Sequence, residues 1–273
     1  MGEAPAFEVE AVGRTDVGQR RDHNEDSFLV DGGLGLYIVA DGMGGHAGGG
    51  TASRLAVETI QTSVRKAREK EPGLFGAPTG VEESPLPDVL REAVEAACTR
   101  IFETAQGDPE LAGMGTTVTA ALLDGRTAFI AHVGDSRCYL LRGGRIYQVS
   151  EDHSLVNEQL KAGAISVDEA KHSRFKNIIT RSVGFEQQVQ VDLLGVELEP
   201  NDVLLLCCDG LSNLVDDAEI LQVVGESPLD ETPSRLIEVA NERGGDDNIT
   251  VVLVRVQEPT SASRPPGEPV APT

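Results

Sequence analysis

Apolar residues gather in ten short segments, in which they either alternate with polar residues or run without a break. Both patterns are typical of β-strands. The segments are 7–13, 27–31, 36–41, 116–124, 127–135, 137–142, 146–150, 191–198, 202–209 and 249–256. The short sequences "DGR" and "RGGR" separate two pairs of these segments and are typical of hairpin turns. Much of the β-sheet is therefore expected to be antiparallel.

Longer stretches repeat their apolar residues with the period of a helix. Two such stretches, 47–70 and 86–105, interrupt the strands, and two shorter ones lie at 216–224 and 232–243. Strands in hairpins, with helices inserted in blocks, favour an α+β fold in layers over a doubly wound parallel sheet.

Three segments lack a regular pattern. Residues 71–87 are rich in Pro and Gly and are expected to form a loop, and the polar residues 153–185 are expected to form a mobile surface flap. The last residues, 257–273, contain five prolines and are expected to be disordered.

Composition and charge narrow the class of protein. The 273 residues carry a net charge of −22, which disfavours binding to nucleic acid or to anionic membranes. No apolar run approaches 18 residues, and the N-terminus lacks the basic and apolar regions of a signal peptide. The four cysteines show no metal-ligand spacing and are expected to be small buried side chains in a reducing cytoplasm. The sequence therefore predicts a cytoplasmic protein with no nucleic-acid or membrane partner.

Aspartates stand at the ends of four of the predicted strands. Asp41 and Asp209 each close an apolar segment and precede a glycine, Asp135 closes 127–135, and Asp247 stands just before 249–256. If these ends share one edge of the sheets, the carboxylates crowd together and need a cation to neutralise them. Oxygen ligands of this kind select Mg²⁺ or Mn²⁺, and the Gly42 carbonyl is a further candidate ligand.

Other interpretations of these residues were weighed. An Asp-Gly pair is also a common turn, and Asp124-Gly125, between two strands, is assigned to one. The stretch "GMGGHA" fits a dinucleotide-binding loop, but Asp41 would face the pyrophosphate and the second strand with its ribose acid is missing. Arg21 is suited to bind phosphate through its guanidinium, or else is a surface arginine paired with Glu25 or Asp26.

Eight motifs, taken in order, resemble those of the bacterial metal-dependent protein phosphatases of the 2C type, which act on phosphoserine and phosphothreonine. They are "RRDHNED", "VADGMGGH", "GTT", "VGDSR", "EDHSLV", "NIITRSVG", "CDGLSN" and "DDNITVVLV", and the resemblance covers residues 8–256. It implies a four-layer α-β-β-α sandwich of two antiparallel sheets flanked by helices, with two Mn²⁺ or Mg²⁺ ions at one end.

The resemblance also implies a role for each matching residue. Asp41 would bridge the two metals, with the Gly42 carbonyl, Asp209 and Asp247 as further ligands. Asp135 would bind a third, weaker metal beneath the flap. Glu25 and Asp26 would hold metal-bound water, and Arg21 would bind the phosphate.

The sequence departs from the family at two positions. Many members have a histidine, a candidate general acid, at the position of Met43, and some have an acid at the position of Asn213. The first departure leaves the general acid unassigned, and the second puts the third metal in doubt. His46, five residues after Asp41, is interpreted as fixing the loop.

The function expected from the resemblance is hydrolysis of phosphoserine and phosphothreonine in proteins by metal-activated water. The substrates would be those of Ser/Thr protein kinases, in signalling, and the chain would act as a monomer. Two alternatives stay open: a pseudophosphatase that binds phosphoproteins without turnover, and a phosphatase acting on an anti-sigma-factor antagonist.

Overall fold

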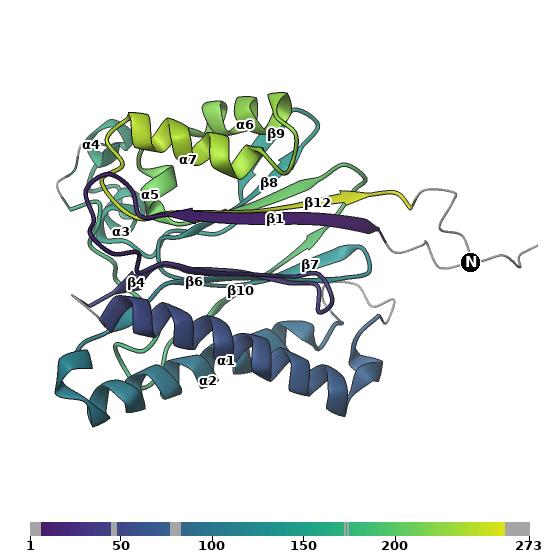
Figure 1. Cartoon of the computed structure of the whole chain (residues 1–273), viewed down its shortest axis with the longest axis horizontal. Coiled ribbons are helices and arrows are strands. Elements are labelled where there is room, and N and C mark those ends of the chain that lie inside the picture. The colour runs from purple at the N-terminus through teal and green to yellow at the C-terminus, as the bar shows by residue number, and fades with distance from the viewer. Residues whose placement is uncertain (1–6, 45–47, 77–82, 172, 174, 260–273) are drawn as a thin grey trace, which may run out of the picture.

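A computed structural model describes residues 7–44, 48–76, 83–171, 173 and 175–259. Two five-stranded antiparallel sheets lie face to face, with helices over both outer faces (Figure 1). The α-β-β-α sandwich expected from the sequence is confirmed.

The first sheet, here sheet A, has the strand order β1-β12-β11-β8-β9. Its strands are β1 (Glu8–Asp16), β12 (Ile249–Gln257), β11 (Val203–Cys207), β8 (Arg137–Arg142) and β9 (Arg145–Gln148). Sheet A therefore joins the first strand of the chain to the last along their whole length.

The second sheet, here sheet B, has the strand order β10-β7-β6-β3-β2. Its strands are β10 (Asp192–Glu197), β7 (Thr127–Val133), β6 (Val118–Asp124), β3 (Leu36–Ala40) and β2 (Ser27–Asp31). A small ladder of β4 (Gly42–Met43) and β5 (Gly115–Thr116) continues from the ends of this sheet. Asp124 pairs with Thr127 across a tight hairpin, so the turn predicted at Asp124-Gly125 is confirmed.

Helices complete the outer layers. The long pair α1 (Gly48–Lys70) and α2 (Leu86–Gly107) covers sheet B, and α5 (Asp209–Ser212), α6 (Asp217–Glu226) and α7 (Thr232–Glu242) cover sheet A. Short 3₁₀ turns occupy Pro72–Leu74 and Pro109–Leu111. None of the helices within the described ranges is long and apolar enough to cross a membrane.

Strand β3 is apolar throughout because both of its faces are covered. Leu36 and Ile38 pack toward α1 and α2, whereas Tyr37 and Val39 point into the layer between the sheets. Alternate side chains of a strand face opposite sides, so a strand covered on both sides needs apolar residues at every position.

The segment 153–185 is more ordered than the expected flap. It contains α3 (Leu155–Lys161) and α4 (Val167–Lys171). Ser154 caps α3 by accepting a hydrogen bond from the backbone N–H of Asn157, at 3.3 Å. Helices α3 and α5 lie at the same end of the sandwich as β4 (Figure 1).

Candidate metal centre

The aspartates predicted at strand ends meet at the end of the sandwich where β4, α3 and α5 lie. Asp41 follows β3 of sheet B, whereas Asp209 follows β11 and Asp247 precedes β12, both in sheet A. Burial raises the pKa of Asp41 well above its ordinary value, and the charges of Asp26, Asp209, Asp135 and Asp247 raise it further. The sequence was therefore right that these carboxylates converge.

Burial is also the main reason why the pKa values of the neighbouring carboxyl groups are raised. It raises the pKa of Asp26 to about 7 and that of Asp135 to about 8, and the charge of Asp209 adds to both. The pKa of Asp209 is likewise raised by burial and by Asp247. Such a group of buried carboxylates is stable in its ionised form only when a cation neutralises it.

The hydrogen bonding of the carboxylates tests whether a cation fits. Four of their buried oxygens find no hydrogen-bond partner among the described residues: Glu25 Oε1, Asp26 Oδ1, Asp135 Oδ1 and Asp209 Oδ1. Buried polar atoms are normally paired, so unpaired acceptors crowded at one site point to a ligand that accepts their lone pairs. Because they are carboxylate oxygens, Mn²⁺ or Mg²⁺ suits them.

The loop that carries Glu25 is held by Asn248, a residue that the sequence analysis did not single out. Asn248 Oδ1 accepts a hydrogen bond from the backbone N–H of Glu25 at 2.8 Å. Its Nδ2 donates to the backbone carbonyls of Val17 and His23, at 2.9 and 3.0 Å. One buried side chain thus fixes both ends of the loop on which Arg21 lies.

Arg21 points to the metal centre, although its ion-pair partner was not foreseen. Its Nη2 donates to Asp247 Oδ2 at 2.7 Å, and half of the side chain is exposed. The alternative pairing with Glu25 or Asp26 was wrong, because the partner lies 226 residues away in the sequence. The guanidinium therefore lies beside a predicted ligand and within reach of solvent.

The glycines after Asp41 allow close backbone packing. A Cβ on Gly49 would lie 2.8 Å from the carboxyl carbon of Glu25, and one on Gly42 would collide with the carbonyl oxygens of Gly49 and Glu25. These glycines let α1 begin directly against the loop that carries Glu25. The Gly42 carbonyl stays a predicted ligand, and His46 lies outside the described residues.

Asp41 is fixed through its backbone. Its N–H donates to Thr117 Oγ1 at 2.9 Å, and its carbonyl accepts from the Thr117 N–H and from Thr116 Oγ1, both at 2.8 Å. The Thr117 hydroxyl also bonds the Ser136 hydroxyl at 2.8 Å, next to Asp135. The motif "GTT" therefore positions one predicted ligand and connects it to another.

The flap is tied to the Asp135 loop by His153. The backbone N–H of His153 donates to the Gly134 carbonyl at 2.8 Å, and the Gly134 N–H donates to His153 Nδ1 at 3.0 Å. Because Nδ1 accepts, Nε2 carries the proton and donates to Asp192 Oδ2 at 3.0 Å. Arg181 also donates to Asp192, so both ends of the flap meet there.

The two departures from the family pattern have defined places. Met43 lies in β4, paired with Gly115 of β5. Asn213 Nδ2 donates to Asp209 Oδ2 at 2.9 Å, so it orients a predicted ligand and adds no carboxylate.

A groove of about 870 Å³ opens from Asp135 and Asp209. Its lining includes Asn157 and Lys176 of the flap and Asp216 and Asp217 at the start of α6. Asp216 caps α6 by accepting from the Glu219 N–H, and Glu219 accepts from the Asp216 N–H in return.

Comparison with known proteins bears on this site. The sequence model of the family described as "Protein phosphatase 2C" matches residues 16–253. The serine/threonine phosphatase stp of Listeria welshimeri is 40% identical over 245 residues, which cover 88% of this chain and 93% of the relative. The protein phosphatase PhpP of Streptococcus pneumoniae is 38% identical over 249 residues, covering 89% and 96%.

Solved structures agree with these sequence matches. The S. agalactiae serine/threonine phosphatase superposes with a TM-score of 0.80 at 38% identity, covering 92% of this chain and 100% of that one. The catalytic domain of the serine threonine protein phosphatase PstP, solved in complex with two manganese ions, gives 0.79 at 35% identity, covering 93% and 100%.

Proposed function

Because this chain belongs to the protein phosphatase 2C family and is a metal-dependent protein-serine/threonine phosphatase, we propose that Asp41, Asp209 and Asp247 form its catalytic metal centre. Asp41, which directly follows β3 of sheet B, would help hold both of two Mn²⁺ or Mg²⁺ ions, with the Gly42 carbonyl as an additional ligand. The observation that carries this assignment is the convergence of carboxylates on buried Asp41, whose pKa is raised by burial and by the charges of Asp209 and Asp247. The unpaired buried oxygen of Asp209 supports it. The two manganese ions of the PstP catalytic domain support the proposed number of two metal ions.

The ions would supply the chemistry that no side chain here provides: when bound, they lower the pKa of water and withdraw charge from the phosphate. Glu25 and Asp26 lie close to the centre and would orient water by accepting its hydrogen bonds. The Asp26 carboxyl is itself fixed, since Thr250 Oγ1 donates to its Oδ2 at 2.6 Å.

Arg21 would bind the phosphate of the substrate. Its guanidinium has five N–H donors, and the bond to Asp247 uses one of its nitrogens. A fixed positive charge beside the phosphoryl oxygens stabilises charge that develops in the transition state. Asp247 would thus hold a metal and also orient the arginine.

Asp135 would bind a third, weaker metal under the flap. Its Oδ1 is buried and unpaired, and the Gly134–His153 bonds position the loop that carries it. Asn213 bonds Asp209 in place of adding an acid, so this third site would have few charged ligands and low affinity.

The substrate segment would lie in the groove between the flap and α6, with its phosphoserine or phosphothreonine at the metal centre. We infer that the substrates are products of Ser/Thr protein kinases and that a monomer acts on them. The catalytic domain would span residues 8–256. The expected disordered tail, 257–273, lies outside the described residues except for 257–259.

Substitution of the two Asp-Gly aspartates tests the metal centre. Asp41→Asn and Asp209→Asn each remove a ligand charge, so we expect kcat on a phosphothreonine peptide to fall at least about 10²-fold with Mn²⁺ present. Asp124→Asn is the matched control, because Asp124 stands in a third Asp-Gly pair but lies in a hairpin, where it accepts from the Gly76 N–H. Turnover near wild type in either test variant would mean that this aspartate is only a turn residue and not a metal ligand.

A further inference from the structure

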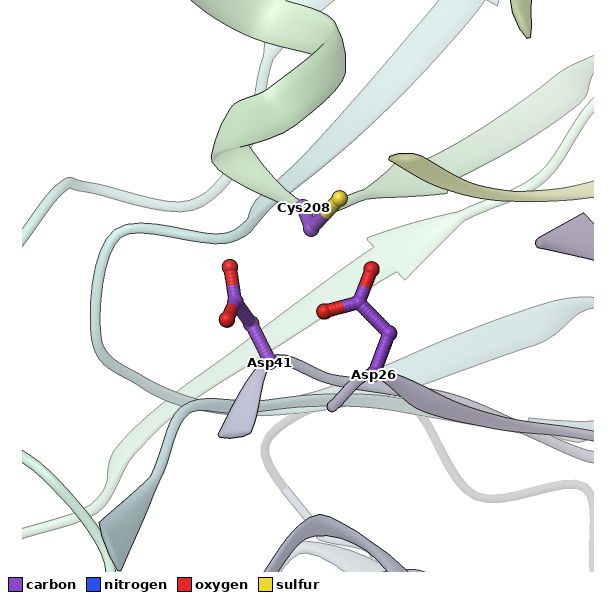
Figure 2. Close-up of side chains that lie close together, drawn as sticks. All are labelled: Asp26, Asp41 and Cys208. Atoms are coloured by element: carbon purple, nitrogen blue, oxygen red, sulfur yellow. The ribbon is translucent and has the colours of Figure 1, made fainter. Parts of the chain in front are cut away.

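Cys208 lies against the metal centre. The residue precedes Asp209 and is fully buried, and its Sγ lies within 4.8 Å of a carboxylate oxygen of Asp26 and one of Asp41. Those two oxygens are also within 4.8 Å of each other. Figure 2 shows the three side chains brought together from three separate segments of the chain.

The hydrogen bonds of these groups leave one carboxylate oxygen without a partner among the described residues. Cys208 Sγ accepts a hydrogen bond from the Thr250 N–H at 3.0 Å and donates one to the Asn248 carbonyl at 3.3 Å. Asp26 uses Oδ2 to accept from Thr250, while its Oδ1 is buried and has no partner among the described residues. One sulfur and an unpaired carboxylate oxygen thus lie at the same place.

The neighbouring thiols differ in surroundings. Cys207 is equally buried, but it lies in the apolar layer beneath α5, α6 and α7, whereas Cys208 lies on the inter-sheet side of β11. The sequence expectation that all four cysteines are free and buried is confirmed. Cys208 is the one that the described structure groups with two carboxylates.

We propose that Cys208, Asp26 and Asp41 form a cation site for thiophilic metals such as Zn²⁺ or Cd²⁺, and that its occupation inhibits the phosphatase. Thiolate sulfur favours Zn²⁺ and similar ions, whereas Mn²⁺ and Mg²⁺ favour oxygen. As the metal–sulfur bond forms, the thiol proton passes to solvent, and Asp26 and Asp41 supply the oxygen ligands. Inhibition rests on the proposed function, because Asp41 is shared with the catalytic centre.

Cadmium absorption tests the site directly. The metal-free full-length protein is titrated with Cd²⁺, and the ultraviolet charge-transfer band of a cadmium–thiolate bond is recorded. We expect the band, at one Cd²⁺ per chain, in the wild type and in Cys207→Ser, and its loss in Cys208→Ser. No band in the wild type, or an equal band in Cys208→Ser, would overturn the proposal.

A second measurement needs no variant and so does not depend on whether Cys208→Ser folds. X-ray absorption at the zinc edge of the wild-type protein, loaded with one Zn²⁺ per chain, reports the ligand elements. We expect one sulfur among the ligands, and a shell of oxygen and nitrogen alone would refute the site.

Inhibition is measured separately, so that the two proposals fail separately. Zn²⁺ is added to the Mn²⁺-loaded enzyme during phosphopeptide turnover. The half-inhibiting Zn²⁺ concentration should be at least about tenfold higher for Cys208→Ser than for Cys207→Ser, because a lost ligand costs no less than a lost outer-shell partner. Equal values would refute competition at this site. Absence of Mn²⁺-dependent turnover in the wild type would instead contradict the proposed catalytic centre, whatever the cadmium spectra show.

Discussion

Replacing Asn248 with alanine should weaken both the fold and the catalytic centre. The substitution removes three hydrogen bonds between the side chain and the backbone of Val17, His23 and Glu25. Asn248 is 5% exposed, so solvent has little access to the groups it leaves. At about 1 kcal/mol for each bond, the free energy of unfolding should fall by about 3 kcal/mol.

Urea and thermal unfolding measure this loss. A change of about 3 kcal/mol corresponds to a fall of about 6–12 °C in Tm for a chain of this size. Asn213→Ala is a suitable control, because Asn213 is exposed and its side chain makes one hydrogen bond, to Asp209. We expect that control to change the free energy of unfolding by less than about 1 kcal/mol.

Activity should fall for a different reason. Asn248 orients the loop that carries Arg21, Glu25 and Asp26, and displacing catalytic groups by about 1 Å can cost about 10²-fold. We expect kcat/KM on a phosphothreonine peptide to fall by about this factor at a temperature where the variant is folded. A variant with wild-type kcat/KM and a free energy of unfolding within about 1 kcal/mol of wild type would refute the role given to Asn248.

Three more predictions follow from the charges of the centre. Exhaustive chelation with EDTA should abolish phosphopeptide turnover, and added Mn²⁺ should restore it, whereas turnover that survives chelation would exclude a metal mechanism. Arg21→Ala should lower kcat/KM by the equivalent of about 1.5–3 kcal/mol; an unchanged value would leave Arg21 only as the ion-pair partner of Asp247. Burial raises the pKa of Asp26 to about 7 and of Asp135 to about 8, above their values in the unfolded chain. The folded metal-free protein therefore holds protons that the unfolded chain loses near pH 4, so its Tm should fall as the pH rises from about 4 to about 8. Saturating Mn²⁺ should flatten that fall, and a metal-free Tm that rises over this range would contradict the assigned shifts.

The strands and the converging aspartates could be predicted because their signals are local. The apolar run of β3 records burial on both faces, and Asp41 and Asp209 directly follow such runs. Whether two strand ends meet depends on topology, and the antiparallel hairpins constrain that topology strongly. The local pattern therefore predicted antiparallel strands with helices in layers, whereas the four-layer arrangement was implied by the family resemblance.

The supports of the centre could not be predicted in the same way. Asn248 bonds residues that precede it by 223 to 231 positions, and Arg21 pairs with Asp247 across 226. Nothing in the neighbouring sequence marks such partners. The helices α3 and α4 were missed for another reason, since their five to seven residues are too few to show a helical period.

The central claim, that Asp41, Asp209 and Asp247 hold the catalytic metals, is tested most directly by anomalous diffraction from crystals soaked in Mn²⁺. Data recorded at the manganese absorption edge locate each ion without reference to activity. We expect two strong peaks that share the Asp41 carboxylate as a ligand, with Asp209 and Asp247 completing the pair. Peaks elsewhere on the acidic surface, with none at Asp41, would contradict the proposed centre.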